Sequence, residues 1–150
     1  MKVDGFVKSC EAFLKPDIEN IKVLVVDEAP EMRIFLSTVL SSGGFMPVIT
    51  ENGAEGLRRA AEEMPAIIIL DVMMSGRVNF QLYYSFRQDK KLRDIPVIML
   101  SALSRDTVFH FQKYQSPDFG NRVPEPDAYI EKPPEAEVLL DMVNKLISGP

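Results

Sequence analysis

The sequence has almost none of the residues that build disulfide frameworks or sulfur and imidazole metal sites. Cys10 is the single cysteine, His110 is the single histidine, and tryptophan is absent from the 150 residues. One cysteine excludes a disulfide within the chain and suits a reducing compartment, so we expect a cytoplasmic protein. His110 falls in a predicted helix, where an ordinary surface or packed role is favoured over phosphotransfer.

Long apolar runs and clusters of basic residues are missing as well. No apolar run approaches the length of a membrane span, and residues 1–20 lack the apolar core of a signal peptide. The net charge is −5 and no run of lysine or arginine is present, which argues against binding to nucleic acid. We therefore expect neither a membrane nor nucleic acid as a partner.

The remaining composition is that of a globular protein, and the length suits one domain with a substantial core. We expect residues 21–148 to form this domain and residues 1–20 to form an extension. Phe6, Cys10 and Phe13 follow helical spacing, and Pro16 ends the pattern. The extension is therefore predicted to be a short amphipathic helix that docks on its own domain or on a partner.

Apolar segments and helical patterns alternate five times after residue 20. The predicted strands are residues 21–26, 45–50, 66–70, 96–100 and 128–130, and the predicted helices are residues 30–42, 54–64, 80–88, 105–115 and a last helix after Pro133 and Pro134. Such alternation predicts an α/β fold with a doubly wound parallel sheet and helices on both faces. Pro47 places the second strand at an edge, and residues 116–126 read as a proline-rich loop.

Polar residues follow the carboxyl ends of four predicted strands. Asp27 and Glu28 follow the first strand, Asp71 the third, Ser101 the fourth and Lys132 the fifth. A lone aspartate after a strand is more often a cap of the next turn. The ends of parallel strands share one edge of a sheet, however, so these side chains are expected to converge, and their convergence favours a functional site.

The motifs around these residues resemble those of the receiver domain of bacterial two-component response regulators. The matching stretches are VLVVDE (23–28), IIILDVMMSG (67–76), VIMLSA (97–102) and YIEKPP (129–134). The resemblance implies the flavodoxin-like strand order 2-1-3-4-5, with five parallel strands. It also implies transfer of a phosphoryl group from a histidine kinase or a phosphotransfer protein to an aspartate.

The resemblance assigns an acceptor and a metal site. Asp71 is the expected phosphoacceptor. Asp27, Glu28 and Asp71 are expected to hold Mg²⁺ together with the backbone carbonyl of Met73, because this hard cation prefers oxygen ligands. Glu28 stands where the family usually has aspartate, and Ser75 stands where proline is common.

A second group of residues is expected to bind the phosphoryl group and to report its presence. Lys132 is expected to pair with Asp71 or its phosphoryl group, and Ser101 to donate to a phosphoryl oxygen. The small side chain of Ala102 would leave room for entry, and Tyr129 is expected to move together with Ser101. The resemblance also implies a cis peptide bond between Lys132 and Pro133.

These expectations describe a phosphoaccepting receiver that signals through changed protein contacts and is no enzyme beyond its own phosphoryl transfer and dephosphorylation. Because the sequence ends at Pro150, directly after the last predicted helix, we expect no output domain. The downstream partner is expected to bind at the fourth predicted helix, the fifth predicted strand and the fifth predicted helix. Whether the protein forms a homodimer is left open by the sequence. The alternative is a pseudo-receiver, an interaction module that phosphorylation does not switch. A hydrolase is disfavoured because no second catalytic base is evident.

Overall fold

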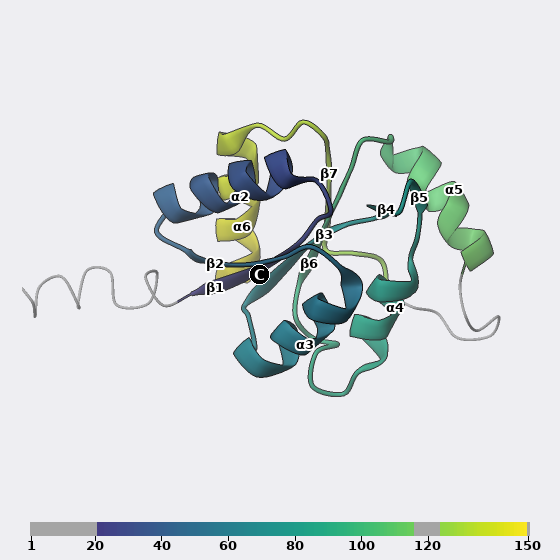
Figure 1. Cartoon of the computed structure of the whole chain (residues 1–150), viewed down its shortest axis with the longest axis horizontal. Helices are drawn as coiled ribbons and strands as arrows, with labels where there is room; N and C mark the ends of the chain where they lie inside the picture. Colours follow the sequence, from purple (N-terminus) through teal and green to yellow (C-terminus); the bar gives the residue numbers. More distant parts are fainter. Residues whose placement is uncertain (1–20, 116–123, 150) are drawn as a thin grey trace, which may run out of the picture.

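A sheet of five parallel strands forms the centre of the protein in the computed structural model, which describes residues 21–115 and 124–149. The strands are β1 (Lys22–Val26), β2 (Met46–Thr50), β3 (Ile67–Asp71), β6 (Val97–Ser101) and β7 (Ala128–Glu131). They lie in the order β2-β1-β3-β6-β7, and each neighbouring pair is parallel. The predicted flavodoxin-like order is thus confirmed (Figure 1).

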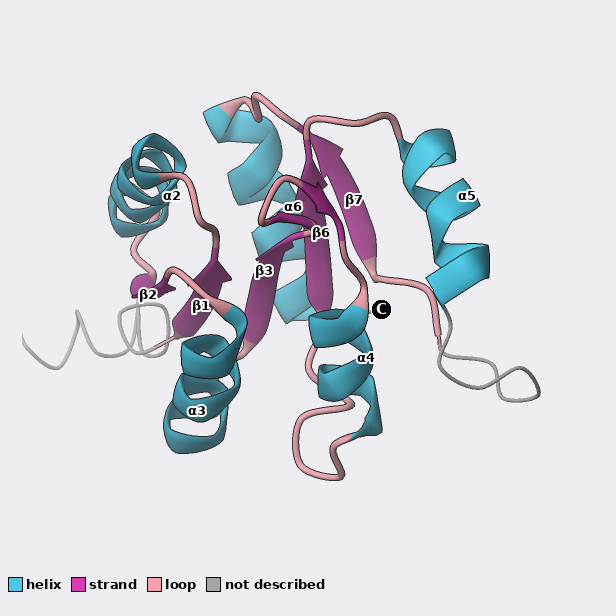
Figure 2. Cartoon of the chain, turned by 45° about the vertical axis from the view of Figure 1, so that its right-hand side comes forward, coloured by secondary structure: helices cyan, strands magenta, loops and turns pink. Residues whose placement is uncertain are grey.

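Helices cover both faces of this sheet, as predicted (Figure 2). One face packs against α2 (Pro30–Ser42) and α6 (Ala136–Ser148), and the other against α3 (Gly53–Glu63), α4 (Gln81–Gln88) and α5 (Arg105–Gln115). Each face has its own apolar cluster, so the core consists of two layers separated by the sheet. None of the helices in the described residues is both long and apolar enough to cross a membrane.

Burial along the strands explains the apolar runs of the sequence. All residues of β3 and β6 are buried, because these strands lie inside the sheet with helices on both faces. The outer strands β2 and β7 contain both buried and accessible residues. Pro47, which cannot donate a ladder hydrogen bond, lies in the edge strand β2 as predicted.

Local capping residues set where the helices begin. Pro30 occupies the start of α2, where a missing N–H costs nothing. The side chain of Asn52 accepts a hydrogen bond from the N–H of Glu55 at 2.9 Å and caps α3. Ser104 Oγ accepts from the N–H of Thr107 at 3.3 Å and caps α5.

The structure contains one small element that the sequence patterns did not indicate. Strands β4 (Met73–Met74) and β5 (Arg77–Val78) form an antiparallel hairpin directly after Asp71. Its two central residues, Ser75 and Gly76, have φ values of 59° and 79°. Strands of two residues are too short to show periodicity, so no pattern in the sequence indicates them. The predicted helix within residues 1–20 and most of the predicted 116–126 loop lie outside the described residues.

A buried arginine ties α4 to the edge of the sheet opposite Asp71. The guanidinium of Arg87, only 7% exposed, donates to the carbonyls of Arg93 and Ile95 at 3.0 Å each. It also pairs with Asp127 Oδ2 at 2.8 Å, and this same oxygen accepts the N–H of Val97. One side chain thus connects the C-terminal end of α4, the start of β6 and the residue before β7.

We predict that Arg87→Met destabilises the protein by about 3 kcal/mol, because it removes the hydrogen bonds of the buried Arg87 side chain to the carbonyls of Arg93 and Ile95 and its ion pair with Asp127. Urea unfolding measures this change in the free energy of unfolding. Arg58→Met is the matched control, since Arg58 makes an exposed ion pair with Glu62 in α3. That pair contributes about 0.5 kcal/mol at most. Equal losses in the two variants would contradict the role assigned to Arg87.

Candidate functional site

Four strand ends bring their polar side chains to one edge of the sheet. Asp27 follows β1, Asp71 ends β3, Ser101 ends β6 and Lys132 follows β7. Parallel pairing in register places these ends side by side, with Asp71 opposite Leu100 in the ladder between β3 and β6. Asp27, Asp71 and Ser101 are all buried there. The sequence had predicted that these groups converge at one edge of the sheet.

Lys132 bridges the two buried aspartates. Its Nζ lies 3.0 Å from Asp27 Oδ2 and 3.1 Å from Asp71 Oδ2. The aspartate side chains are 1% and 4% exposed, and the lysine side chain is 15% exposed. Buried carboxylates need such a partner, since an unpaired charge in this environment is strongly destabilising.

The remaining carboxylate oxygens are held by the backbone. Asp27 Oδ1 accepts the N–H of Ala29 at 2.8 Å, and Asp71 Oδ1 accepts the N–H of Met73 at 2.8 Å. Asp27 Oδ2 is the one buried side-chain oxygen in the described part of the chain that accepts no well-aligned hydrogen bond. Its contact with Lys132 is an ion pair only, so this oxygen keeps a free coordination direction.

The electrostatics of the site follow from one cation shared by two carboxylates. The pKa of Asp71 is raised to about 6, chiefly by burial and also by the charge of Asp27, while the N–H of Met73 and the ammonium of Lys132 oppose the rise. Burial alone would lower the pKa of Lys132, but the two carboxylates outweigh burial and raise it. Lys132 is therefore charged at neutral pH, and most Asp71 carboxyls are ionised.

Glu28, the next residue after Asp27, points toward a different partner. Its Oε1 accepts the N–H of Ser75 at 2.7 Å, and its Oε2 lies 3.4 Å from Ser75 Oγ. The guanidinium of Arg33 donates to the backbone carbonyls of Asp27 and Glu28 at 2.8 Å each. The backbone of this acidic pair is therefore fixed from α2, while the side chain of Glu28 reaches across to the β4–β5 hairpin.

Ser101 and Tyr129 are connected through one residue of the loop before α5. Ser101 Oγ accepts the N–H of Leu103 at 3.0 Å, and the hydroxyl of Tyr129 donates to the carbonyl of Leu103 at 2.8 Å. Tyr129 is half-buried, and burial raises its pKa. Ala102 lies exposed between these two contacts, which leaves the approach to Ser101 unobstructed by a large side chain.

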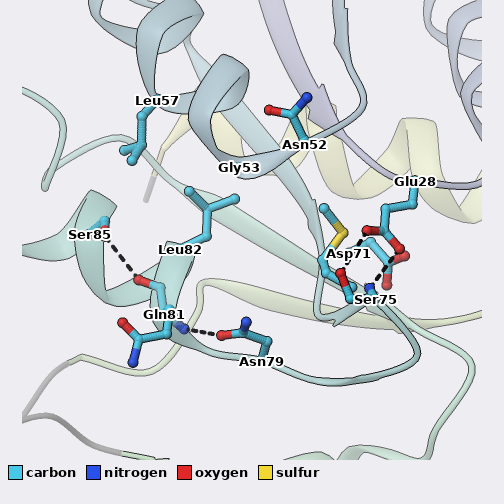
Figure 3. Close-up of a pocket in the computed structure, with 11 residues that line it drawn as sticks. Glu28, Asn52, Gly53, Leu57, Asp71, Ser75, Asn79, Gln81, Leu82 and Ser85 are labelled. Atoms are coloured by element: carbon cyan, nitrogen blue, oxygen red, sulfur yellow. Dashed lines mark hydrogen bonds between the residues drawn. The ribbon is translucent and has the colours of Figure 1, made fainter.

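A cleft of about 350 Å³ opens beside Asp71, between α3 and α4. Figure 3 shows Glu28, Asp71 and Ser75 at one end of it and Leu57 and Leu82 at the other. The two charged side chains in its lining are both carboxylates. The end of the cleft next to Asp71 is therefore suited to a cation.

The carboxylates of Glu28 and Asp71 at this end are oxygen donors of the kind that Mg²⁺ prefers. Asp27 Oδ2, with its free direction, fits such an ion. Within the described residues, however, no group of three or more acidic, histidine or cysteine side chains is arranged to hold a metal. Glu28 is engaged by Ser75, so the predicted set of three carboxylates is not assembled.

Residues 23–144 match the family model of the response regulator receiver domain. The chain belongs to the response regulator receiver family. This receiver is 29% identical to the protein PilH of Pseudomonas aeruginosa over 128 residues, which cover 85% of the chain and 98% of PilH. It is 33% identical to the phosphate regulon regulator PhoB of Escherichia coli over 81 residues, or 54% of this chain and 35% of PhoB.

A solved structure supports the same conclusion. The signal receiver domain of a histidine kinase from Syntrophus aciditrophicus superposes with a TM-score of 0.70 at 28% identity, covering 85% of this chain and 90% of that one. The predicted membership in the receiver family of two-component signalling is thereby confirmed. The roles assigned to individual site residues stay predictions, although Asp27, Asp71 and Lys132 do meet as expected.

The sequence predicted some further details of the site but not others. The Lys132–Pro133 peptide bond is cis, as the resemblance implied. His110 lies exposed on α5. The contacts of Arg33 and Ser75 were not predicted. A Ser-Gly pair between short apolar segments was the available signal for the turn at Ser75, whereas no sequence pattern marks Arg33 as the residue that holds the acidic loop.

The raised pKa of Asp71 predicts a stability that falls with rising pH when no metal is present. Between about pH 4 and 6 the folded state keeps a proton that the unfolded state, with an ordinary aspartate pKa, has lost. The free energy of unfolding therefore decreases through this range. We expect Asp71→Asn to stabilise the metal-free protein at neutral pH by up to about 3 kcal/mol, and by little below pH 4.

Urea unfolding in the presence of a chelator, at several pH values, measures this effect. Asp141→Asn, at an exposed position of α6, is the matched control and should change stability little at any pH. A stabilisation by Asp71→Asn that does not depend on pH would mean that the charge of Asp71 is not its cause.

Proposed function

We propose that this receiver accepts a phosphoryl group on Asp71 from a histidine kinase or a phosphotransfer protein. The observation that carries the proposal is the position of Asp71. Its carboxylate is buried at the end of the central strand β3, 3.1 Å from the ammonium of Lys132 and beside Asp27. Among the buried carboxylates of the described residues, it is also the one that lines the open cleft.

In the proposed reaction, a carboxylate oxygen of Asp71 forms a bond to phosphorus while the bond from phosphorus to the donor imidazole nitrogen breaks. The imidazole leaves with the electron pair and takes up a proton from solvent. The product is an acyl phosphate, and attack by water returns the aspartate and inorganic phosphate. The protein catalyses its own transfer and dephosphorylation and acts on no further substrate.

The residues around Asp71 supply positioning and charge. The N–H of Met73 orients one carboxylate oxygen at 2.8 Å, which leaves the second oxygen beside Lys132. Lys132 would neutralise the incoming phosphoryl oxygens, and Ser101 would donate to one of them. Bound Mg²⁺ would supply further positive charge for these oxygens. Asp27, Asp71 and the Met73 carbonyl would hold the ion, and Glu28 would join them only after its carboxylate leaves Ser75.

We infer that the output surface consists of α5, β7 and α6. A groove of about 280 Å³ lies there, lined among others by Arg105, Phe109, Tyr129 and Lys145. The rings of Phe109 and Tyr129 are 6.0 Å apart, and the Arg105 guanidinium lies 5.1 Å above the Phe109 ring. A downstream protein partner or a second copy of the chain would bind here. The single cysteine and a kinase partner suit a cytoplasmic location.

The contacts of Leu103 supply a physical connection between the site and this groove. If Ser101 Oγ turns to a phosphoryl oxygen, the N–H of Leu103 loses its acceptor. The loop that carries the Leu103 carbonyl then has to adjust, and this carbonyl is the acceptor of the Tyr129 hydroxyl. Phosphorylation would thereby change the position of the Tyr129 ring in the groove.

A pseudo-receiver that phosphate does not switch is the second candidate. One observation favours it: the carboxylate of Glu28 is hydrogen-bonded to Ser75 and not gathered with Asp27 and Asp71. In this case the same surfaces would bind partners constitutively. The two candidates differ in a single measurable property, the modification of Asp71.

We predict that acetyl phosphate with Mg²⁺ adds one phosphate to the protein, and that Asp71→Asn abolishes the addition because the nucleophile is gone. Intact-protein mass spectrometry measures the product. Asp141→Asn should label like the wild type. Labelling that survives in Asp71→Asn would exclude Asp71 as the acceptor, and a wild type that never labels, even with kinase, would favour the pseudo-receiver.

We further predict that beryllofluoride, a phosphoryl mimic, changes amide hydrogen exchange in α5 and β7. Ser101→Ala should greatly reduce the change, because the Leu103 N–H then has no hydroxyl to lose. Ser42→Ala is the matched control, since its hydroxyl bonds within α2 to the Val39 carbonyl. Identical exchange with and without the mimic in the wild type would refute a switch at this surface.

A further inference from the structure

The hydrogen bond between Glu28 and Ser75 joins two loops that are 47 residues apart in the sequence. Figure 3 shows both side chains beside Asp71 at the same end of the cleft. The bond is short, 2.7 Å, and its acceptor is ionised, which makes it one of the stronger kinds of hydrogen bond. It therefore constrains the β4–β5 hairpin relative to the acidic loop after β1.

The turn conformation shows why residue 75 can donate. Ser75 has a φ of 59°, in the left-handed region, and Gly76 follows with 79°. Proline cannot adopt such a φ and has no N–H. Serine at this position therefore permits both the hairpin turn and the bond to Glu28, and proline would permit neither.

The length of the side chain at residue 28 matches this donor. Aspartate would carry its carboxylate roughly 1.5 Å closer to the backbone. Arg33 fixes the backbone carbonyls of residues 27 and 28 at 2.8 Å each, so the backbone cannot readily advance to close that gap. Glutamate at 28 and serine at 75 thus form a matched pair.

We propose that Glu28 and Ser75 form a latch, which holds the β4–β5 hairpin against the acidic loop when no metal is bound. Glu28 is not gathered with Asp27 and Asp71 in the described residues, so coordination of a metal by all three requires the Glu28 carboxylate to leave Ser75. Metal binding then has to open the latch, and an intact latch lowers the affinity for metal by the same factor. The metal part of this inference rests on the proposed function, while the latch itself does not.

The first test uses the metal-free protein and needs no phosphorylation. NMR measures the exchange of the Ser75 amide proton with water, with a chelator present. We expect Glu28→Asp to speed this exchange about tenfold or more, as loss of a hydrogen bond to a charged group implies. Ser75→Gly keeps the N–H and should keep the chemical shift of a hydrogen-bonded amide at residue 75.

Glu31→Asp is the matched control, because Glu31 is exposed in the first turn of α2 and the substitution removes the same methylene. It should leave the Ser75 amide unchanged. Ser75 exchange that is equally fast in the wild type and in Glu28→Asp would overturn the latch. This outcome would leave the phosphorylation of Asp71 untouched, so the two proposals fail separately.

The second test adds Mg²⁺ and follows the melting temperature together with the Ser75 amide. We expect the Ser75 amide of the wild type to lose protection as the metal binds, and Glu28→Asp to bind Mg²⁺ more tightly. A metal-dependent thermal shift in Glu28→Asp alone would also support the competition. Tight binding to the wild type with an unchanged Ser75 amide, or no shift in either protein, would overturn it.

Discussion

Two buried carboxylates share a single ammonium group, and the arrangement of the site depends on this contact. Lys132 lies 3.0 Å and 3.1 Å from Asp27 and Asp71, on strand ends that are far apart in the sequence. The ion pairs tie β1, β3 and the segment after β7 together at one edge of the sheet. Without the lysine, two desolvated charges would repel one another, and no other cation of the described residues pairs with them.

Because Asp27 and Asp71 share the one ammonium group of Lys132, the three groups together carry one net negative charge. The raised pKa of Asp71 and the oxygen of Asp27 that accepts no hydrogen bond are two signs of the same imbalance. The imbalance costs stability in the empty protein, but it also prepares the site for a cation. Stability and the proposed function are therefore opposed at this edge of the sheet, whereas the apolar layers on both faces contribute to stability.

The sequence was most informative where one physical rule acts alone. The unbroken apolar runs of β3 and β6 identified buried strands, and parallel strand ends predicted which polar groups would meet. Patterns of apolar residues did not predict the β4–β5 hairpin, because strands of two residues show no periodicity. Such patterns also could not identify Ser75 or Arg33, because their roles depend on backbone groups and a turn conformation, which no side-chain pattern records.

The anchoring of Asp127 has a consequence for how this chain tolerates variation in length. The N–H of Asp127 donates to the Val97 carbonyl at 3.0 Å and its side chain pairs with Arg87, so the residue before β7 is fixed to β6 and α4. Insertions or deletions between α5 and Asp127 leave the position of Asp127 unchanged, because its own contacts fix it to β6 and α4. The register of β7 is set afterwards, and Lys132 reaches the two aspartates regardless of how many residues precede the anchor. The geometry of the opposite edge therefore depends little on the length of this connection, and added residues cost only a slowly rising loop-closure entropy.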